Sequence, residues 1–241
     1  MFYQKVLSFV AALAVLFATT TATFATRTEN HISDKKNARI LTPLNIAILI
    51  QDDLISQVGN ELDITRDFIR SLPAGSRVMT GYITSGTLQV RQPFTTDLDT
   101  AARSLRIPFA SQAASPFNPY VEVSEALRRF DVGWKGTNAV LLISDGLDTS
   151  RGFDSGAAGN TLDLDRAIKY ANDRNVAVYS FYAPSVGLTS RSRLAASYGQ
   201  SSLNRLAKET GGKAFFQGTG FVSFDSHFRR LREALNAQYA N

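Results

Sequence analysis

Two apolar segments of this chain each run directly into aspartate. Residues 44–50 (Leu-Asn-Ile-Ala-Ile-Leu-Ile) precede Asp52, and residues 138–144 (Asn-Ala-Val-Leu-Leu-Ile-Ser) precede Asp145. Short and nearly continuous apolar runs are typical of strands that are buried on both faces of a parallel sheet. In an open α/β sheet, the binding crevice lies outside the carboxyl ends of the strands. We therefore expect both aspartates at one edge of a single sheet, although they are far apart in the sequence.

The rest of the sequence alternates between helix and strand patterns. Apolar residues follow helical spacing over residues 58–72, 123–130 and 163–174, and strand patterns cover residues 176–182 and 213–217. This alternation is typical of a three-layer, doubly wound α/β fold, in which helices cover both faces of a mainly parallel sheet.

Two other segments complete the predicted architecture. Residues 77–83 and 87–91 flank Thr84-Ser85-Gly86, a pattern that predicts a β-hairpin and therefore one antiparallel edge strand. Residues 184–200 are polar and are predicted to form a long loop. A helix is expected after them, over residues 202–210, ending at Gly211-Gly212.

The amino terminus has the order of features of a secretory signal peptide. Lys5 precedes an apolar run over residues 6–17, and small residues follow, with cleavage expected after Ala22 or Ala25. The apolar run is short for a transmembrane helix. An uncleaved signal anchor is the alternative, and it would be the one contact with a membrane.

The predicted organisation has three parts: a signal peptide over residues 1–25, a polar linker over residues 26–42 and one domain over residues 43–241. The protein is accordingly expected to be secreted or periplasmic. The sequence contains no cysteine, so disulfides cannot stabilise the domain and its core must do so alone.

Charge and composition exclude several classes of function. The net charge is +5, but lysine and arginine are scattered and form no basic stripe with interleaved aromatic residues, so nucleic-acid binding is not expected. His31 and His227 do not follow buried strands, and cysteine is absent. A Ser-His-Asp or Cys-His catalytic site is therefore not expected.

Asp52, Ser56 and Asp145, together with the strand–helix alternation and the hairpin, resemble the von Willebrand factor A (VWA) domain, in particular its branch in secreted bacterial proteins. The most specific segment, residues 141–148 (Leu-Leu-Ile-Ser-Asp-Gly-Leu-Asp), is similar to the strand-Asp-Gly element of that family. The resemblance covers residues 40–238. It implies a Rossmann-like fold, a non-enzymatic protein-binding role and a metal-ion-dependent adhesion site.

The adhesion site of the family uses an Asp-x-Ser-x-Ser loop, a threonine from a second loop and an aspartate from a third. Asp52, Ser56 and Asp145 match three of these positions, whereas Leu54 replaces the middle serine. No threonine is present at 120 or 121, where the second loop is expected. Mg²⁺ prefers about six oxygen ligands, and the residues that could add oxygens are Asp53, Asn118 and Ser124.

Three hypotheses for function remain open at this point. The first is a protein-binding domain that uses Mg²⁺ at the carboxyl ends of the strands, and the second is a metal-free interaction domain whose cation site has decayed. The third is a Mg²⁺-dependent hydrolase that uses Asp52 and Asp145. It is disfavoured because Leu54 occupies the place of the second carboxylate that such enzymes need. A purely structural alternative is that Asp52 and Asp53 cap the first helix and that Asp145-Gly146 forms a turn.

Overall fold

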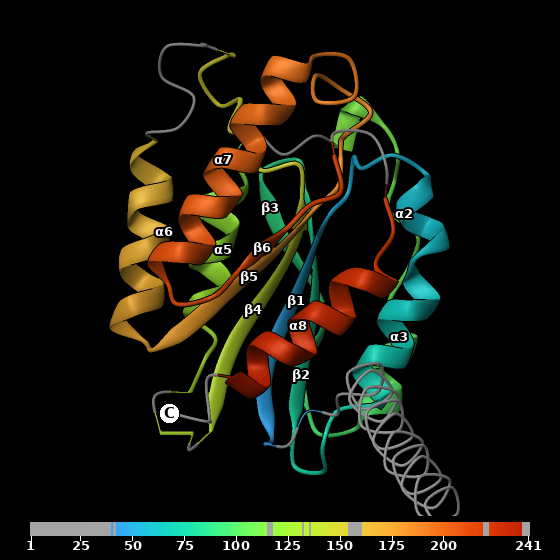
Figure 1. The fold of residues 1–241 in the computed structure, drawn as a ribbon, viewed down its shortest axis with the longest axis vertical. Coiled ribbons are helices and arrows are strands. Elements are labelled where there is room, and N and C mark those ends of the chain that lie inside the picture. The colour runs from blue at the N-terminus through green and yellow to red at the C-terminus, as the bar shows by residue number, and fades with distance from the viewer. Residues whose placement is uncertain are drawn as a thin grey trace, which may run out of the picture. The chain divides into compact units, whose positions relative to one another are not determined.

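The computed structural model describes one α/β domain (Figure 1). The residues described are 40, 42–114, 118–131, 133–134, 136–153, 161–218 and 222–237. The predicted signal peptide lies outside them, as does the predicted linker apart from residues 40 and 42.

A six-stranded sheet forms the centre of the domain. The strands are β1 (Leu44–Gln51), β2 (Arg77–Thr84), β3 (Thr87–Thr95), β4 (Thr137–Ser144), β5 (Val176–Tyr182) and β6 (Ala214–Phe215). Their order is β3-β2-β1-β4-β5-β6, and all neighbours are parallel except β2 and β3. The predicted doubly wound sheet with one antiparallel edge strand is therefore confirmed.

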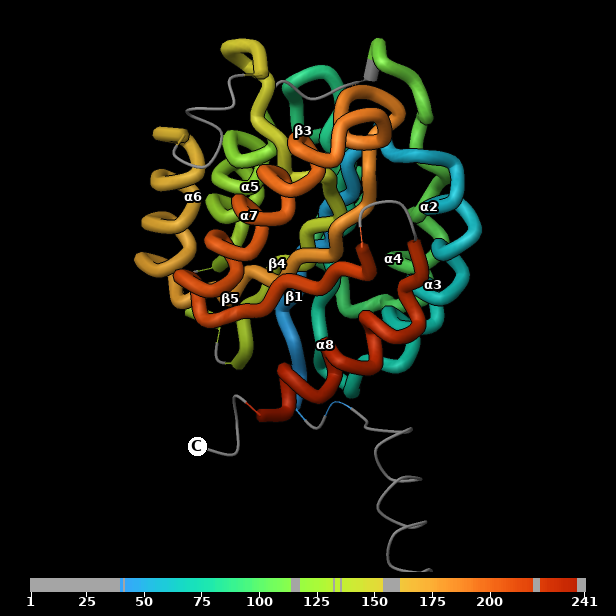
Figure 2. Tube along the Cα trace, turned by 45° about the horizontal axis from the view of Figure 1, so that its top comes forward, coloured from blue at the N-terminus to red at the C-terminus, as the bar shows by residue number. Residues whose placement is uncertain are grey.

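Helices cover both faces of this sheet (Figures 1 and 2). The helices are α2 (Gln57–Asn60), α3 (Leu62–Arg70), α4 (Leu98–Arg103), α5 (Pro119–Leu127), α6 (Leu162–Asp173), α7 (Arg193–Glu209) and α8 (Asp225–Ala237), with a 3-10 turn η1 (Gln112–Ala114). Side chains of α2, α3, α4 and α8 form one apolar core, and side chains of α5, α6 and α7 form the other. The predicted three layers are thus present.

Strand β1 shows why its sequence lacks the usual apolar–polar alternation. Ile46, Ile48 and Ile50 enter the core beneath α3 and α8, whereas Ala47 and Leu49 enter the core beneath α5 and α7. Every residue of the strand is buried. A strand between two helical layers needs apolar side chains on both faces, and this need accounts for the continuous run.

The prediction of a loop over residues 184–200 is wrong in its second half. Helix α7 begins at Arg193, and Ser192 caps it by accepting a hydrogen bond from the amide of Ala195 at 3.2 Å. The buried residues of its first turns are Ala195, Ala196 and Gly199. Such small side chains give a weak periodic signal, because a helix that packs closely through them needs no large apolar residues.

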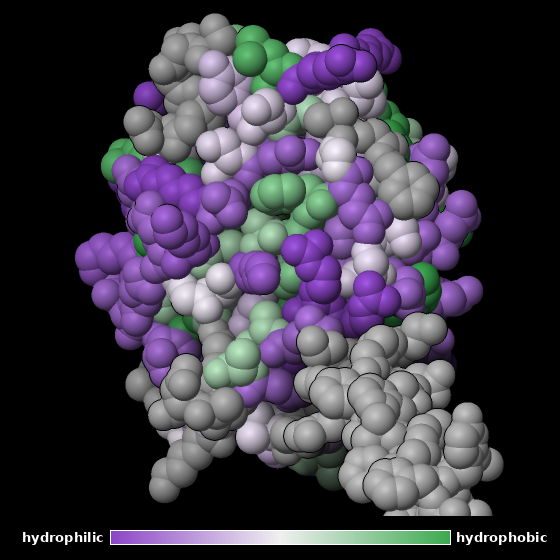
Figure 3. Space-filling model, viewed as in Figure 1, coloured by the Kyte–Doolittle hydropathy of each residue, from purple (hydrophilic) through white to green (hydrophobic). Residues whose placement is uncertain are grey.

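Polar and charged side chains dominate the face seen in Figure 3, where apolar residues gather in a central strip between α7 and α8.

Within the part of the chain that the structure describes, no helix is long and apolar enough to cross a membrane.

His227 of α8 makes stability depend on pH. Its side chain is buried against the ring of Phe181, at 5.1 Å between centroids, and its Nδ1 atom has no hydrogen-bond partner among the described residues. Burial, together with the charge of Arg230, lowers the pKa of His227 to about 4. The neutral ring therefore contributes stability above the unfolded pKa near 6.5, and this contribution is lost as pH falls through about 4.

We expect His227→Phe to remove this acid sensitivity. Between pH 7 and pH 4, the wild-type protein should lose roughly 3 kcal/mol more unfolding free energy than the variant. Urea unfolding at both pH values measures the difference, and the carboxylates common to both proteins cancel. Equal losses in the two proteins would contradict the assignment.

Candidate functional site

The carboxyl ends of β1 and β4 form the centre of one edge of the sheet. The two strands are adjacent, in a register that pairs Ile50 with Ile143, and the order of strands reverses between them. Gln51 joins the two loops that follow, because its Oε1 atom accepts from Ser144 Oγ at 2.5 Å and from the Asp145 amide at 3.2 Å. Such a switch point is where doubly wound proteins place their ligands.

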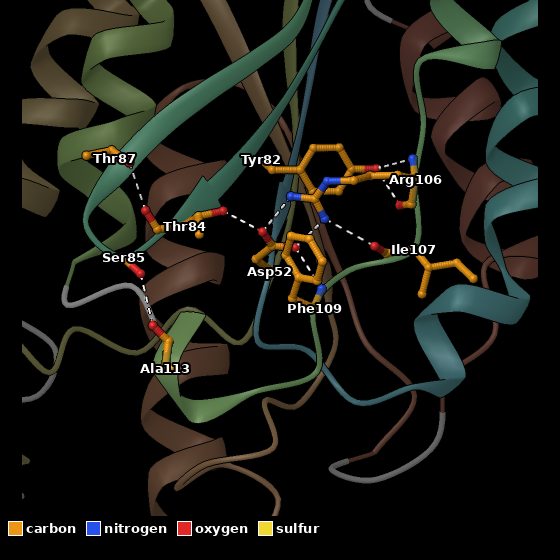
Figure 4. Close-up of polar contacts among 9 residues, drawn as sticks. All are labelled: Asp52, Tyr82, Thr84, Ser85, Thr87, Arg106, Ile107, Phe109 and Ala113. Carbon is orange, nitrogen blue, oxygen red and sulfur yellow. Dashed lines mark hydrogen bonds and ion pairs between the residues drawn. The ribbon is translucent and has the colours of Figure 1, made fainter.

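Asp52 is fully buried at this edge, and four donors surround its carboxylate (Figure 4). Arg106 donates from Nη1 to Oδ1 and from Nη2 to Oδ2, both at 2.6 Å. Thr84 Oγ1 donates to Oδ2 at 2.5 Å, and the amide of Phe109 donates to Oδ1 at 2.8 Å. A carboxylate offers about four acceptor positions, so the acceptor capacity of Asp52 is used within the protein.

Arg106 is held in place by more than this ion pair. Its guanidinium carbon lies 3.9 Å from the centroid of the Tyr82 ring and 4.3 Å from that of Phe109. The hydroxyl of Tyr82 donates to the carbonyl of Arg106 at 2.6 Å and accepts from its amide at 2.7 Å. The segment after α4 is therefore fastened to the end of β2 by ring stacking, hydrogen bonds and a paired charge.

The electrostatics of the pair favour its charged form. Burial by itself would raise the pKa of Asp52, but hydrogen bonds from Arg106, Thr84 and Phe109 outweigh it and bring the pKa below its ordinary value. The hydrogen bond to Asp52 likewise raises the pKa of Arg106. A bidentate arginine–carboxylate pair is among the strongest polar contacts in proteins.

Asp145 has a different environment, although it is also buried. Its Oδ1 atom accepts from the amide of Leu147 at 3.1 Å, and its Oδ2 atom accepts from Thr189 Oγ1 at 3.0 Å. It takes part in none of the ion pairs of the described residues. Burial raises the pKa of Asp145, and hydrogen bonds from Leu147, Ser185 and Thr189 oppose the rise only in part.

A surface of two exposed apolar side chains lies beside the Asp52–Arg106 pair. Ile107 is 66% exposed and Phe109 is 58% exposed. Both follow Arg106 in the fastened segment, and Ile107 lies next to Gly59 of α2. We call Ile107 and Phe109 the apolar rim.

Comparison by sequence finds no relatives, since no protein-family model and no curated protein matches the chain. Comparison by structure, in contrast, finds similar solved structures. BatB from Bacteroides thetaiotaomicron aligns with a TM-score of 0.55 at 16% identity, over 83% of this chain and 100% of that one. An aerotolerance-related membrane protein from Bacteroides fragilis aligns with a TM-score of 0.54 at 14% identity, over 80% of this chain and 99% of that one.

A von Willebrand factor type A protein from Catenulispora acidiphila also aligns, with a TM-score of 0.51 at 17% identity, over 80% of this chain and 42% of that one. This chain has the VWA fold. The resemblance drawn from the sequence is confirmed at the level of the fold, which is what identities this low can establish.

The residues of this VWA fold do not fit the Mg²⁺ ion that the family implies. The acceptor positions of Asp52 are engaged, and the guanidinium of Arg106 already brings a positive charge to the carboxylate. Leu54 is fully buried in the core and has no side-chain oxygen. Among the described residues, no group of three or more His, Cys, Asp or Glu could hold a metal ion.

The other predicted ligands serve different purposes in the VWA fold. Ser56 is exposed at the start of α2 and makes no capping hydrogen bond with its side chain. Asp53 is buried and accepts from Gln51 Nε2 at 2.6 Å. Asn118 caps α5 and donates to Asp163, whereas Ser124 donates to the carbonyl of Tyr120. The sheet edge therefore brings Asp52, Asp53 and Asp145 together, and leaves Asn118 and Ser124 to organise α5.

Sequence reasoning did not find Arg106, Thr84 or Thr189, which supply the donors to the two aspartates. Arg106 is one of 26 lysine and arginine residues in the chain, and it belongs to no recognised motif. The one available signal was its position inside the apolar stretch Leu105-Arg106-Ile107-Pro108-Phe109, where a charged residue needs a partner.

Proposed function

We propose that this VWA-fold domain is a non-enzymatic protein-binding module that docks its partner at the carboxyl edge of the sheet without a divalent cation. The observation that carries the proposal is the bidentate contact of Arg106 with Asp52. It supports the metal-free hypothesis over the Mg²⁺-dependent one, because the charge of Asp52, the first expected ligand of a cation site, is already paired with that of Arg106.

The apolar rim supplies the contact surface of the proposed module. The Phe109 ring stacks on the Arg106 guanidinium, and the Phe109 amide is bound to Asp52, so the side chain is presented in a fixed orientation. A preorganised aromatic side chain loses little conformational freedom on binding and is a common anchor of protein interfaces. We propose a partner that covers Ile107 and Phe109 with apolar side chains.

The same geometry disfavours the hydrolase hypothesis. A nucleophilic aspartate must present an oxygen to its substrate, but Asp52 is fully buried and accepts four hydrogen bonds. Asp145 is also buried and is bound to Leu147 and Thr189. Neither carboxylate is placed for attack.

We further propose that the protein works outside the cytoplasm. The support comes from the sequence alone, namely the charged, apolar and small-residue order of residues 1–25. Detection of a shortened amino terminus in the extracytoplasmic fraction by mass spectrometry tests this part of the proposal.

Two measurements on one protein sample test the binding mode. Calorimetric titration with MgCl₂ and MnCl₂ is expected to give no binding heat, and EDTA is expected to leave the melting temperature unchanged, because Asp52 keeps Arg106. Capture of partners from the extracytoplasmic fraction is expected to be equal in EDTA and in Mg²⁺. Binding heat that disappears in Asp52→Asn would instead establish the cation-dependent form.

Variants of the apolar rim test the surface. Phe109→Ser is expected to weaken partner capture by roughly fivefold or more, the effect of losing more than about 1 kcal/mol at an interface. Leu162→Ser is the matched control, because Leu162 is 56% exposed on α6 and lies outside the rim. Equal capture by wild type and Phe109→Ser would reject the rim as the docking surface.

A further inference from the structure

A groove lies between the β2–β3 hairpin and the helices α5 and α6. It encloses about 630 Å³ and is lined by Leu88 of the hairpin, by Val121, Glu122 and Glu125 of α5, and by Tyr170 of α6. Its volume is in the range of ligand-binding pockets, roughly 300–1,000 Å³. None of these residues belongs to the Asp52 site or to the apolar rim.

Glu122 is a buried carboxylate of this groove without a cationic partner. It is 5% exposed, and the backbone of Leu88 donates a hydrogen bond to it. The ion pairs among the described residues do not include Glu122. The nearby acid Glu125, by contrast, pairs with Arg128 at 3.1 Å and with Arg129 at 3.2 Å.

The charge state of Glu122 reflects this lack of a partner. Burial raises its pKa, the hydrogen bond from Leu88 opposes the rise, and the charge of Glu125 adds to it. A cation that entered the groove would relieve this cost, because a buried carboxylate without a counter-charge is destabilised.

The apolar lining suits an aliphatic chain that carries such a cation. Val121 is 45% exposed at the groove and Leu88 packs against the core nearby. The ring of Tyr170 is already covered by Arg128 and Arg174, whose guanidinium carbons lie 5.7 and 5.5 Å from its centroid. Lysine and arginine combine an apolar stem with a charged end, and they bury the stem along apolar surfaces.

The guanidinium groups of Arg128 and Arg166 also line the groove, but they pair with Glu125 and Asp163. Glu122 is therefore the charged residue of this lining that has no ion-pair partner, and its negative charge suits a cation and not a small anion.

We propose that this groove binds a lysine or arginine side chain of a partner protein, with its charged end on Glu122 and its stem against Val121 and Leu88. This site goes beyond the proposed function, since it is built from other elements. It does not involve the apolar rim, and it does not depend on whether a cation binds near Asp52.

The probe is a capped glycine–lysine–glycine tripeptide, titrated into the purified, isotope-labelled protein and followed by NMR. Saturable shifts of the amide signals of Leu88, Val121 and Glu122 are expected. The same tripeptide with norleucine in place of lysine keeps the stem and loses the charge, and it should bind at least about tenfold more weakly. Equal binding of the two peptides to the wild-type protein would overturn the proposal without any variant.

Two substitutions complete the test. Glu122→Gln is expected to weaken binding of the lysine peptide by about tenfold or more, and its melting temperature should be unchanged or higher because it removes a buried charge. Glu125→Gln is the matched control in the same groove and should stay within about twofold, because Arg128 and Arg129 already hold Glu125. An affinity unchanged by Glu122→Gln, or lost equally in both variants, would overturn the role of Glu122. None of these outcomes bears on partner capture by the rim.

Discussion

Arg106→Met is expected to lower the free energy of unfolding by about 3 kcal/mol or more, the usual effect of removing one partner of a buried ion pair. Asp52 would keep its hydrogen bonds from Thr84 and Phe109 but would remain a buried charge without a counter-charge. Stacking on the rings of Tyr82 and Phe109 would also be lost. Urea unfolding at pH 7 measures the effect.

The double variant Asp52→Asn/Arg106→Met separates the charge from the packing. Because it removes both charges, we expect it to recover more than half of the stability lost in Arg106→Met. Arg205→Met is the matched control. Its ion-pair partners Asp165 and Glu209 are 50% and 46% exposed, so its loss should be within about 1 kcal/mol. If Arg106→Met also lost less than about 1 kcal/mol, the charge of Asp52 would not depend on Arg106 for its stability in the folded protein.

The difference between wild type and Arg106→Met should also depend on pH. The pKa of Asp52 in the folded protein lies below its unfolded value. The stabilisation from the pair is therefore complete above the unfolded pKa of about 3.9, and it is lost as pH falls through the folded pKa. We expect the stability difference between the two proteins to narrow as pH falls below about 4 and to retain the part that comes from lost stacking. A difference that stays constant with pH would point to packing alone.

Gly199→Ala is expected to destabilise the domain by more than about 3 kcal/mol or to prevent folding, beyond the usual range for overpacking. A Cβ atom on Gly199 would lie 1.9 Å from the backbone oxygen of Asp145. Conversely, a Cβ atom on Gly146, which has a φ of +69°, would lie 2.4 Å from the backbone oxygen of Gly199. Helix α7 and the turn after β4 are thus in direct backbone contact. An added methyl group would meet backbone atoms, which cannot rotate out of the way as a flexible side chain can.

Thermal unfolding followed by circular dichroism measures this effect. Gly133→Ala is the control, because a Cβ atom there would meet nothing within 4 Å; it should change stability by less than about 1 kcal/mol. If Gly199→Ala melted within a few degrees of wild type, the close approach of α7 to the Asp145 turn would be contradicted.

Local sequence patterns were sufficient for most of the fold. The runs that precede Asp52 and Asp145 predicted buried parallel strands, and the hairpin around Ser85-Gly86 predicted the antiparallel edge. The strand predictions succeeded because a strand that is buried on both faces needs apolar residues at nearly every position. Such a run of consecutive apolar residues is visible in the sequence without any knowledge of distant contacts. The first half of α7 was missed because Ala195, Ala196 and Gly199 pack closely without a large apolar side chain.

The sequence by itself determined that two aspartates follow buried strands of one sheet, and that Leu54 leaves the family's metal loop without one oxygen. Only the tertiary structure decided what those aspartates contact. Arg106 is 54 residues from Asp52, and Thr189 is 44 residues from Asp145. Periodicity reports which face of an element is buried, but it carries no information on which distant donor reaches a buried carboxylate. That choice depends on how the loops beyond the strands pack, and here it gave one aspartate an arginine and left the other with neutral donors.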